Sequence, residues 1–157
     1  MAEDKLQSFF DRCRENGLKI TPQRTAIYEF LSGSNEHPTA EQIYAEIRKI
    51  YPNISFDTVN RTLKTFAETG LIDMVEGYGS PRRYDPNLVN HHHIHCVKCR
   101  EIFDFQSDDL DDLEIPLEII KEYRILNKRV VLNAVCSRCR RKNQIKKRRQ
   151  KKRSKNE

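Results

Sequence analysis

The run His91-His92-His93-Ile94-His95-Cys96-Val97-Lys98-Cys99 joins four histidines to a Cys-x-x-Cys step. Its Cys-x-x-Cys step is repeated further along the chain as Cys136-Ser137-Arg138-Cys139. Two such steps can supply four thiolates to one tetrahedral zinc ion, which would contribute binding free energy on the order of 10 kcal/mol to folding. We therefore predict a structural zinc site at Cys96, Cys99, Cys136 and Cys139. The alternatives are a redox dithiol and four reduced thiols without a metal.

The histidines beside the first cysteine pair predict a second, different metal site. In an extended strand the side chains alternate, so His91, His93 and His95 would share one face, opposite the adjacent cysteine. Asp104 can meet this face from a neighbouring strand, and Asp85 lies just upstream. Imidazoles combined with carboxylates suit Fe(II) or Mn(II) and do not select zinc. The alternative is a histidine run that binds metal loosely or not at all.

The charge of the chain is divided unevenly. The 157 residues carry a formal charge of +6, but residues 138–157 hold twelve Lys or Arg and one acid, a sum of +11, which leaves −5 on residues 1–137. We expect residues 143–157 to form a disordered basic tail that adds a salt-sensitive attraction to a polyanion such as DNA. No apolar run approaches the roughly 20 residues that cross a bilayer, and no secretion signal is present, so we expect no membrane partner and a cytoplasmic location.

Helical spacing of apolar residues predicts four helices in the first half of the chain. Their start and stop signals are, in order, Gly17, Thr21-Pro22, Pro38-Thr39, Ser55 and Gly70, and the fourth helix runs from about 56 to 69. Strands at 71–76 and 81–85 then flank a glycine-bearing turn at 77–80. This order predicts a winged-helix domain over residues 1–84 with a helix-turn-helix; a helical bundle with an incidental hairpin is the alternative.

The second half of the chain begins at a hinge around Asp85-Pro86-Asn87. We expect a strand pair at 91–97 and 100–105, a helix at 110–121 with an uncertain start because of Pro116, and a long strand at 123–135. This order predicts a small α/β domain over residues 85–142. The chain as a whole is expected to be α+β.

Together these motifs resemble the ferric uptake regulator family. The resemblance covers about residues 4–142 and is carried by Gly17-Leu18-Lys19-Ile20-Thr21-Pro22-Gln23-Arg24, His37-Pro38-Thr39-Ala40, His91-x-His93-x-x-Cys96-x-x-Cys99, Asp104-Phe105 and Cys136-x-x-Cys139. Members of that family are homodimeric bacterial repressors with an N-terminal winged helix and a C-terminal α/β dimerisation domain. A divalent metal at the junction licenses their binding to DNA.

The resemblance assigns roles to individual residues. It implies a regulatory Fe(II) or Mn(II) site at His37, Asp85, His91, His93 and Asp104, and a structural Zn(II) site at the four cysteines. Because His37 belongs to the first domain and most of the other ligands belong to the second, a metal that joins them would bias the hinge. The same resemblance implies a double-stranded DNA operator and a second copy of the chain as partners.

Two features point to the peroxide-responsive branch of the family. Asp85 and Asp104 stand where iron sensors more usually carry glutamate. In that branch hydrogen peroxide reacts at an open position of the bound Fe(II) and converts a ligand histidine to 2-oxo-histidine, and on this pattern His37 and His91 would be oxidised. The alternative is an iron- or manganese-responsive repressor without peroxide chemistry.

The DNA-contacting residues are expected in the first domain, with candidates Lys19, Thr21, Gln23, Arg24, Ser55, Thr58, Asn60, Arg61 and Lys64. The family commonly has tyrosine at the position of Asn60, and Arg61 resembles the iron-sensing branch, so the operator is left open. Arg61 could reach a guanine edge, and Asn60 an adenine or a phosphate.

Two further functions compete with a metal-dependent repressor. A metalloenzyme could use the His/Asp site for hydrolysis, but no general base stands out beside it, so we expect no enzyme. A constitutive DNA-binding protein would need only the zinc. Operator binding with and without Fe(II) or Mn(II) separates these readings.

Overall fold

The computed structural model describes residues 2–34, 36–75, 81–142 and 145. It divides the chain into two compact units, the first ending at Val89 and the second beginning at Asn90. The domain boundary predicted from the sequence lies between residues 84 and 85, five residues earlier. The predicted turn at 77–80 and, apart from Ile145, the predicted disordered tail at 143–157 lie outside the described residues.

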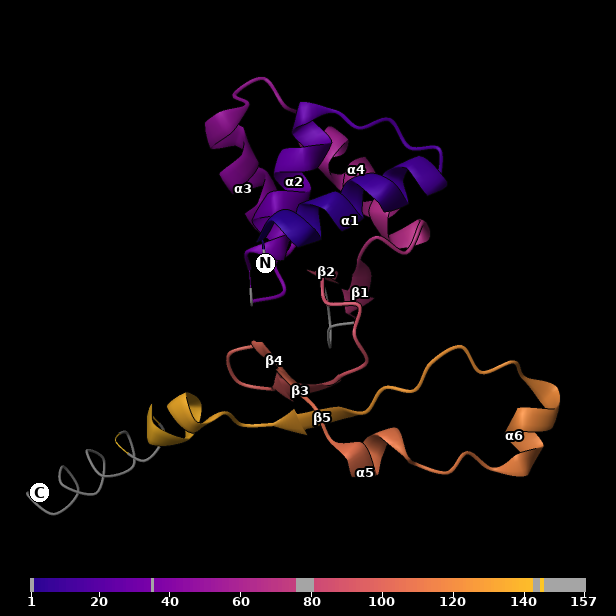
Figure 1. Ribbon diagram of the computed structural model, residues 1–157. Coiled ribbons are helices and arrows are strands. Elements are labelled where there is room, and N and C mark those ends of the chain that lie inside the picture. Colours follow the sequence, from indigo (N-terminus) through magenta and orange to yellow (C-terminus); the bar gives the residue numbers. More distant parts are fainter. Residues whose placement is uncertain (1, 35, 76–80, 143–144, 146–157) are drawn as a thin grey trace, which may run out of the picture. The chain divides into compact units, whose positions relative to one another are not determined.

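Four helices make up most of the first unit: α1 (Ala2–Glu15), α2 (Pro22–Ser32), α3 (Ala40–Ile50) and α4 (Phe56–Glu68) (Figure 1). They are the four helices that the apolar spacing predicts. Each begins or ends at the signal that the sequence supplies, because these signals satisfy backbone groups that a helix terminus leaves unpaired.

The caps are visible as individual hydrogen bonds. The Thr21 hydroxyl accepts from the backbone N–H of Arg24 at 3.3 Å, and the Ser55 hydroxyl accepts from the backbone N–H of Thr58 at 3.1 Å. Thr39 and Gln42 form a reciprocal capping box at the start of α3. Gly70 follows α4 with φ +68°, a left-handed conformation that favours glycine.

The hydrophobic core of the described chain lies in the first unit. The Phe9 ring stacks on Tyr28 with centroids 4.2 Å apart and meets Phe66 edge-on at 5.5 Å. Around these rings pack buried aliphatic residues from α2, α3 and α4 and from the segment after α4: Ile27, Leu31, Ile43, Ile47, Val59, Leu63, Leu71 and Ile72.

A two-stranded antiparallel hairpin completes the first unit. Strand β1 (Asp73–Val75) pairs with β2 (Arg83–Asp85), with Asp73 opposite Asp85. The hairpin is attached to the segment before α3: the Tyr84 backbone N–H donates to the Pro38 carbonyl at 3.1 Å. Four helices with this hairpin form the predicted winged helix.

The second unit is built on a three-stranded sheet with the order β4-β3-β5. Strand β3 (His92–Cys96) pairs antiparallel with β4 (Ile102–Phe105) and parallel with β5 (Val131–Ala134). The crossover between β4 and β5 contains the short helices α5 (Asp108–Asp111) and α6 (Leu117–Glu122) (Figure 1). Helices and mixed strands give the α+β class that the sequence predicts.

Two element predictions in this unit are wrong in extent. The helix expected at 110–121 is two short helices, because Pro116 has an extended ψ of 138° and its ring nitrogen has no hydrogen to donate. The strand expected at 123–135 is only the four residues of β5. A strand persists only where it has a partner, and β3 offers a register from His93 to Cys96 and no further.

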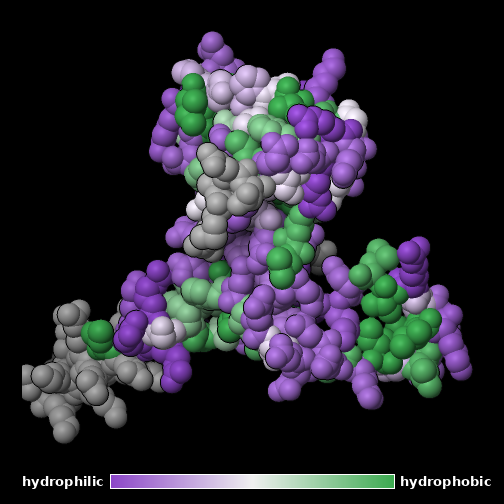
Figure 2. All heavy atoms as spheres, in the orientation of Figure 1, coloured by the Kyte–Doolittle hydropathy of each residue, from purple (hydrophilic) through white to green (hydrophobic). Residues whose placement is uncertain are grey.

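The second unit buries little apolar surface of its own. Of its described hydrophobic residues, Cys96 and Ile102 are buried, whereas the first unit buries sixteen. Large apolar side chains between residues 113 and 126 lie exposed, with Leu117 68% and Leu126 84% exposed. Figure 2 shows apolar side chains gathered over α6. We call residues 113–126 the apolar face.

Among the described residues, no helix combines the length and the apolar character needed to cross a bilayer.

Candidate metal centres and nucleic-acid interface

The second unit brings four cysteine sulfurs together. Cys96 ends β3, Cys99 lies in the turn after it, Cys136 follows β5, and Cys139 lies in a helical stretch at 137–142 that the sequence analysis does not anticipate. All four sulfurs lie within 4.8 Å of one another, and none is in a disulfide. A tetrahedral site with Zn–S bonds of about 2.3 Å needs sulfurs about 3.8 Å apart. The Cys99 and Cys136 sulfurs are 3.8 Å apart, so this cluster fits zinc.

The backbone around the cluster favours a thiolate at one position. Burial raises the pKa of the Cys96 thiol, but the backbone N–H groups of Cys136, Cys99 and Lys98 outweigh it and lower the pKa to about 6. Burial and the neighbouring sulfurs raise the pKa of Cys139 to about 12. Four crowded sulfurs do not all ionise by themselves, whereas a divalent cation would supply the charge that makes four thiolates stable.

An ion pair beside the cysteines was not found from the sequence. The Arg138 guanidinium, in the second Cys-x-x-Cys step, pairs with the Glu101 carboxylate, which follows the first step. The pair links the two segments that carry the sulfurs. Its only signal in the sequence is an acid just after one Cys-x-x-Cys step and a base inside the other, a pattern too common to predict a contact.

A second group of donors lies on the other face of β3. The Nε2 atoms of His91 and His93 are 3.0 Å apart, and Asp104 Oδ1 lies 3.7 Å from the first and 3.4 Å from the second. Asp104 reaches them because it stands opposite His93 in the β3–β4 register. Two ring nitrogens that face each other at this distance share one proton or bind one cation. Neighbouring ligands of an octahedral ion with bonds of about 2.1 Å are about 3.0 Å apart, so the three residues fit such an ion.

Alternation along β3 separates the two groups. His92, on the cysteine side, lies against the Phe105 ring with centroids 5.3 Å apart and accepts a hydrogen bond from the Val130 backbone N–H at 3.3 Å. Its Nε2 is 3.5 Å from an Asp111 carboxylate oxygen. His92 therefore packs inside the second unit, and the strand period found the right face for His91 and His93.

The first unit holds a smaller pair of donors. His37 and Asp85 are both buried, and His37 Nε2 lies 3.5 Å from Asp85 Oδ2. His37 has a positive φ of 47°, an uncommon backbone conformation for a residue with a side chain. The Arg83 guanidinium donates to the His37 carbonyl at 3.0 Å and holds this loop against β2. Arg83 is a positioning contact that the sequence gives no means to find, because the partners are 46 positions apart.

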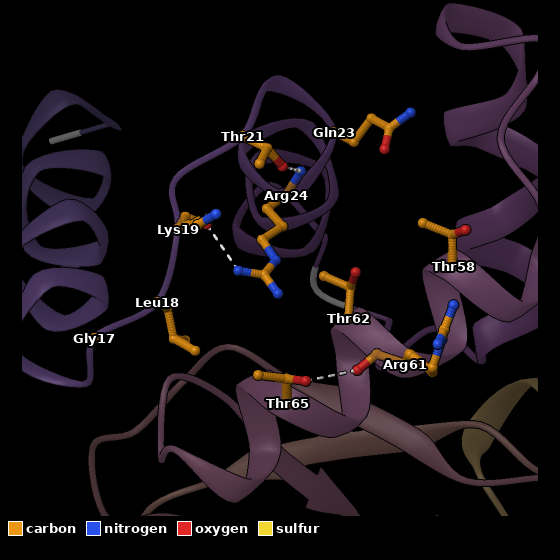
Figure 3. A pocket seen from close by; sticks show the side chains of 10 residues that line it. All are labelled: Gly17, Leu18, Lys19, Thr21, Gln23, Arg24, Thr58, Arg61, Thr62 and Thr65. Atoms are coloured by element: carbon orange, nitrogen blue, oxygen red, sulfur yellow. Dashed lines mark hydrogen bonds between the residues drawn. The ribbon is translucent and has the colours of Figure 1, made fainter.

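A cleft of about 570 Å³ opens on the first unit (Figure 3). Six of the nine residues predicted to contact DNA line it: Lys19, Thr21, Gln23, Arg24, Thr58 and Arg61. The Arg24 guanidinium is fixed there by donating to the Lys19 carbonyl at 2.7 Å. Three cations and four threonine hydroxyl groups around one cleft suit an anionic ligand.

The remaining three candidates lie elsewhere on or near α4. Asn60 and Lys64 are exposed, and Lys64 Nζ lies 3.7 Å from a Glu68 carboxylate oxygen. The Ser55 hydroxyl is within 2.8 Å of the Thr58 hydroxyl and also caps the helix. Ser55 thus has a structural role whether or not it meets a ligand.

Comparisons with known proteins agree with this architecture. Residues 15–134 match the model of the family described as "Ferric uptake regulator family". The chain belongs to the ferric uptake regulator family. It is 34% identical over 137 residues to the peroxide-responsive repressor PerR of Staphylococcus saprophyticus, covering 87% of this chain and 93% of that protein. PerR of Staphylococcus aureus strain Mu50 is equally similar, at 34% identity over the same shares of both chains.

Solved structures give the same family. The Helicobacter pylori ferric uptake regulator Fur, whose structure is described as revealing three functional metal binding sites, has a TM-score of 0.73 at 26% identity and covers 89% of this chain and 94% of its own. A zinc-bound manganese uptake regulator has a TM-score of 0.63 at 28% identity and covers 82% of this chain and 98% of its own. Ferric uptake regulator family proteins are metal-responsive transcriptional repressors that bind DNA operators, not enzymes, so this chain is not a metalloenzyme.

One face of α4 is exposed and lies opposite the face that packs on the core. Val59, Thr62, Leu63 and Phe66 are buried, which leaves Asp57, Asn60, Arg61 and Lys64 on the opposite side. The second helix of a helix-turn-helix uses its N-terminal residues to contact base edges in the major groove. The position of Asn60 and Arg61 in the first half of α4 agrees with that use.

Proposed function

We propose that this chain is a homodimeric repressor in which one Fe(II) or Mn(II) ion, held by residues of both units, controls binding to a DNA operator. Peroxide would end the repression by oxidising a histidine ligand of the iron form. The observation that carries the proposal is the pair of half-sites, His37 with Asp85 in the first unit and His91, His93 and Asp104 in the second.

The number of donors supports a shared ion. Each half-site alone offers two or three donors, which is too few to fill the six positions of an octahedral ion. The five residues together would fill five positions and leave one for water or peroxide. Three imidazoles with two carboxylates are also the donor set expected for Fe(II) or Mn(II) rather than for a soft, thiolate-seeking ion.

A shared ion would act as a switch by favouring one arrangement of the two units. In a dimer, the distance between the two recognition helices must match the spacing of the two halves of the operator, which lie about one helical turn of DNA apart. A ligand that binds one arrangement more tightly shifts the population toward it, and operator affinity would then report metal occupancy.

The zinc site would have a structural role. Zn(II) at Cys96, Cys99, Cys136 and Cys139 would hold the turn after β3 to the segment after β5, in a unit that buries few apolar residues of its own. Zinc does not take part in redox chemistry and prefers a closed four-ligand shell in such sites.

A second copy of the chain would cover the apolar face. Large contiguous apolar patches on a protein surface mark interaction sites. Seven large side chains of this face are exposed in one copy: Leu113, Leu117, Ile119, Ile120, Tyr123, Ile125 and Leu126. Their burial between two copies would supply the core that each second unit lacks.

Peroxide sensing is the finer part of the proposal. It is supported by the peroxide-responsive repressors among the relatives and by aspartate at 85 and 104. Bound Fe(II) would supply the activation of H2O2 at the open position. In the overall reaction one oxygen atom of H2O2 is added to an imidazole carbon of His37 or His91, and the other leaves as water. The 2-oxo ring no longer offers the same nitrogen donor, so the switch is lost.

DNA contacts would come from local cations because residues 1–137 carry a net negative charge. A phosphate in the cleft beside Lys19 and Arg24 would fix the register of the domain on the duplex. The basic residues at 143–157 would add sequence-independent affinity. A repressor of this kind works beside the chromosome, so we place it in the cytoplasm.

The test begins with an operator selected in vitro from a randomised duplex library by the Mn(II)-loaded protein. Binding to that operator is then measured with Mn(II), with Fe(II) under anaerobic conditions, and after chelation of the regulatory metal. A metal-dependent repressor binds in the first two conditions and not in the third. Equal binding in all three would contradict the proposal.

The peroxide step is tested on the same complexes. The Fe(II) and Mn(II) forms are treated with H2O2, and peptide mass spectrometry is used to look for addition of one oxygen atom at His37 or His91. Oxidation confined to the iron form, together with loss of operator binding, supports peroxide sensing. Unmodified histidines in both forms would leave an iron- or manganese-responsive repressor without peroxide chemistry.

A further inference from the structure

The first turn of α4 carries an acid where DNA binding would favour a base. Asp57 is exposed, and its Oδ2 lies 3.0 Å from Nε of Arg61, one helical turn further along. The side chains of Arg61 and Asp57 are 75% and 71% exposed. A carboxylate on this surface would repel the phosphates that the neighbouring cations attract.

Helix stability alone does not account for the pair. An acid in the first turn interacts favourably with the helix dipole, but Ser55 already caps α4. Exposed ion pairs four residues apart add little to stability. The same helix has such a pair near its C-terminus, Lys64 with Glu68 at 3.7 Å, well away from the end that reads bases.

The pair matters for how Arg61 presents its guanidinium. Nε is the Arg61 nitrogen nearest to the Asp57 carboxylate. A guanidinium paired at Nε can still present its two terminal nitrogens side by side to another acceptor. Figure 3 shows the Arg61 side chain running along α4 toward Thr58, and so toward the N-terminal end of the helix. Two terminal nitrogens side by side match O6 and N7 of guanine in the major groove. A side chain already held in this orientation loses less freedom on binding.

The pair also changes the charge that Arg61 brings to DNA. A lone arginine here could satisfy itself on any phosphate near the cleft, to which Lys19 and Arg24 also belong. With the Asp57 carboxylate beside it, the net charge of the pair is zero, and a phosphate contact gains little. The contact with a guanine edge is not weakened in this way, because it depends on hydrogen-bond geometry and not on net charge.

We propose that Asp57 is a specificity-determining residue: it orients Arg61 toward one G·C base pair of the operator and reduces its attraction to phosphates. Asp57 acts through Arg61 and is therefore a positioning residue. The inference rests on the proposed function, because it needs the chain to bind DNA through α4.

The experiment compares Asp57→Asn with the wild-type protein, using the operator selected by the Mn(II)-loaded wild type. Arg61→Ala first identifies the base pair that Arg61 reads, as the position where its preference disappears. Glu68→Gln is the matched control, since it removes the acid of the other exposed pair on the same helix. Melting midpoints of all variants show that each remains folded.

Two readouts separate orientation from helix stability. The first readout is the discrimination, which is the affinity for the operator divided by the affinity for the same duplex with the Arg61 base pair replaced. A bidentate contact makes this ratio about 10-fold or more. The second readout is the salt dependence of binding to an unrelated duplex, which reports the net positive charge that the protein brings to the phosphates. The slope of log affinity against log salt concentration should steepen by about 0.9 per recognition helix in Asp57→Asn.

We expect Asp57→Asn to lose most of the discrimination and to bind unrelated duplex more tightly, while Glu68→Gln keeps the wild-type discrimination. Discrimination that is unchanged in Asp57→Asn would overturn the inference while leaving the metal-dependent repressor intact. An equal loss in Glu68→Gln would also overturn it, since any acid on α4 would then serve. If the wild type selects no sequence at all, the proposed function itself fails.

Discussion

Removing the zinc ligands should unfold the second unit and spare the first. The perturbation is Cys136→Ser, or zinc extraction by a strong chelator from the wild-type protein. The contrast arises because the two units differ in what holds them together. The first has a continuous core, whereas the described part of the second buries Cys96 and Ile102 among its hydrophobic residues.

The magnitude follows from these counts. Full burial of one large aliphatic side chain such as Ile102 contributes about 1.5–3 kcal/mol. A structural zinc contributes about 10–16 kcal/mol near neutral pH, as much as the whole net stability of a typical domain. Loss of the zinc therefore exceeds what the apolar residues of one second unit can offset.

The assay is amide hydrogen exchange followed by mass spectrometry, with zinc release measured in parallel by a chromogenic chelator. We expect peptides from 92–105 and 131–139 to lose protection as zinc leaves, while peptides from α2 to α4 keep theirs. Cys13→Ala is the matched control, because Cys13 is buried in the first unit and is not part of the sulfur cluster. It should lower the stability of the first unit without releasing zinc. If β3 and β5 stay protected after complete zinc release, zinc is not what holds the second unit folded.

Three further predictions follow from single features. Leu126→Glu, at an 84% exposed position of the apolar face, should shift the protein from dimer to monomer in sedimentation velocity, whereas Ile50→Glu, 65% exposed in the first unit, should not. Gly70→Ala should destabilise the first unit by about 1 kcal/mol in urea titration, because its φ is +68° and the position is otherwise open, so an unchanged midpoint would contradict a strain account. The pKa of Cys96 is lowered to about 6, so the thiolate persists above that pH, and protons compete with zinc for it below. Zinc affinity measured by chelator competition should therefore fall more steeply with decreasing pH below about 6 than above it. A constant slope through that range would contradict this prediction.

Sequence reasoning succeeded where the deciding physics is local. Thr21, Thr39, Ser55 and Gly70 set helix ends through bonds or dihedral angles within a few residues, so their positions could be read directly. The period of two along β3 likewise separated His91 and His93 from the cysteine side.

It failed where the outcome depends on a distant partner. The strand expected at 123–135 shrank to β5 because the length of β3 limits the pairing. The contact from Arg83 to the His37 carbonyl spans 46 positions and leaves no local pattern. Asp57 and Arg61 have the spacing of an ion pair, but only the structure shows that Nε is the nitrogen nearest to the carboxylate.

If one ion draws ligands from both units, the number of histidines bound to it is three. Pulsed electron paramagnetic resonance on the Mn(II)-loaded full chain resolves the imidazole nitrogens coupled to the metal. The account predicts three, from His37, His91 and His93, and a fall to two in His37→Ala together with loss of operator binding. Two coupled nitrogens in the wild type, or a count that His37→Ala leaves unchanged, would contradict it.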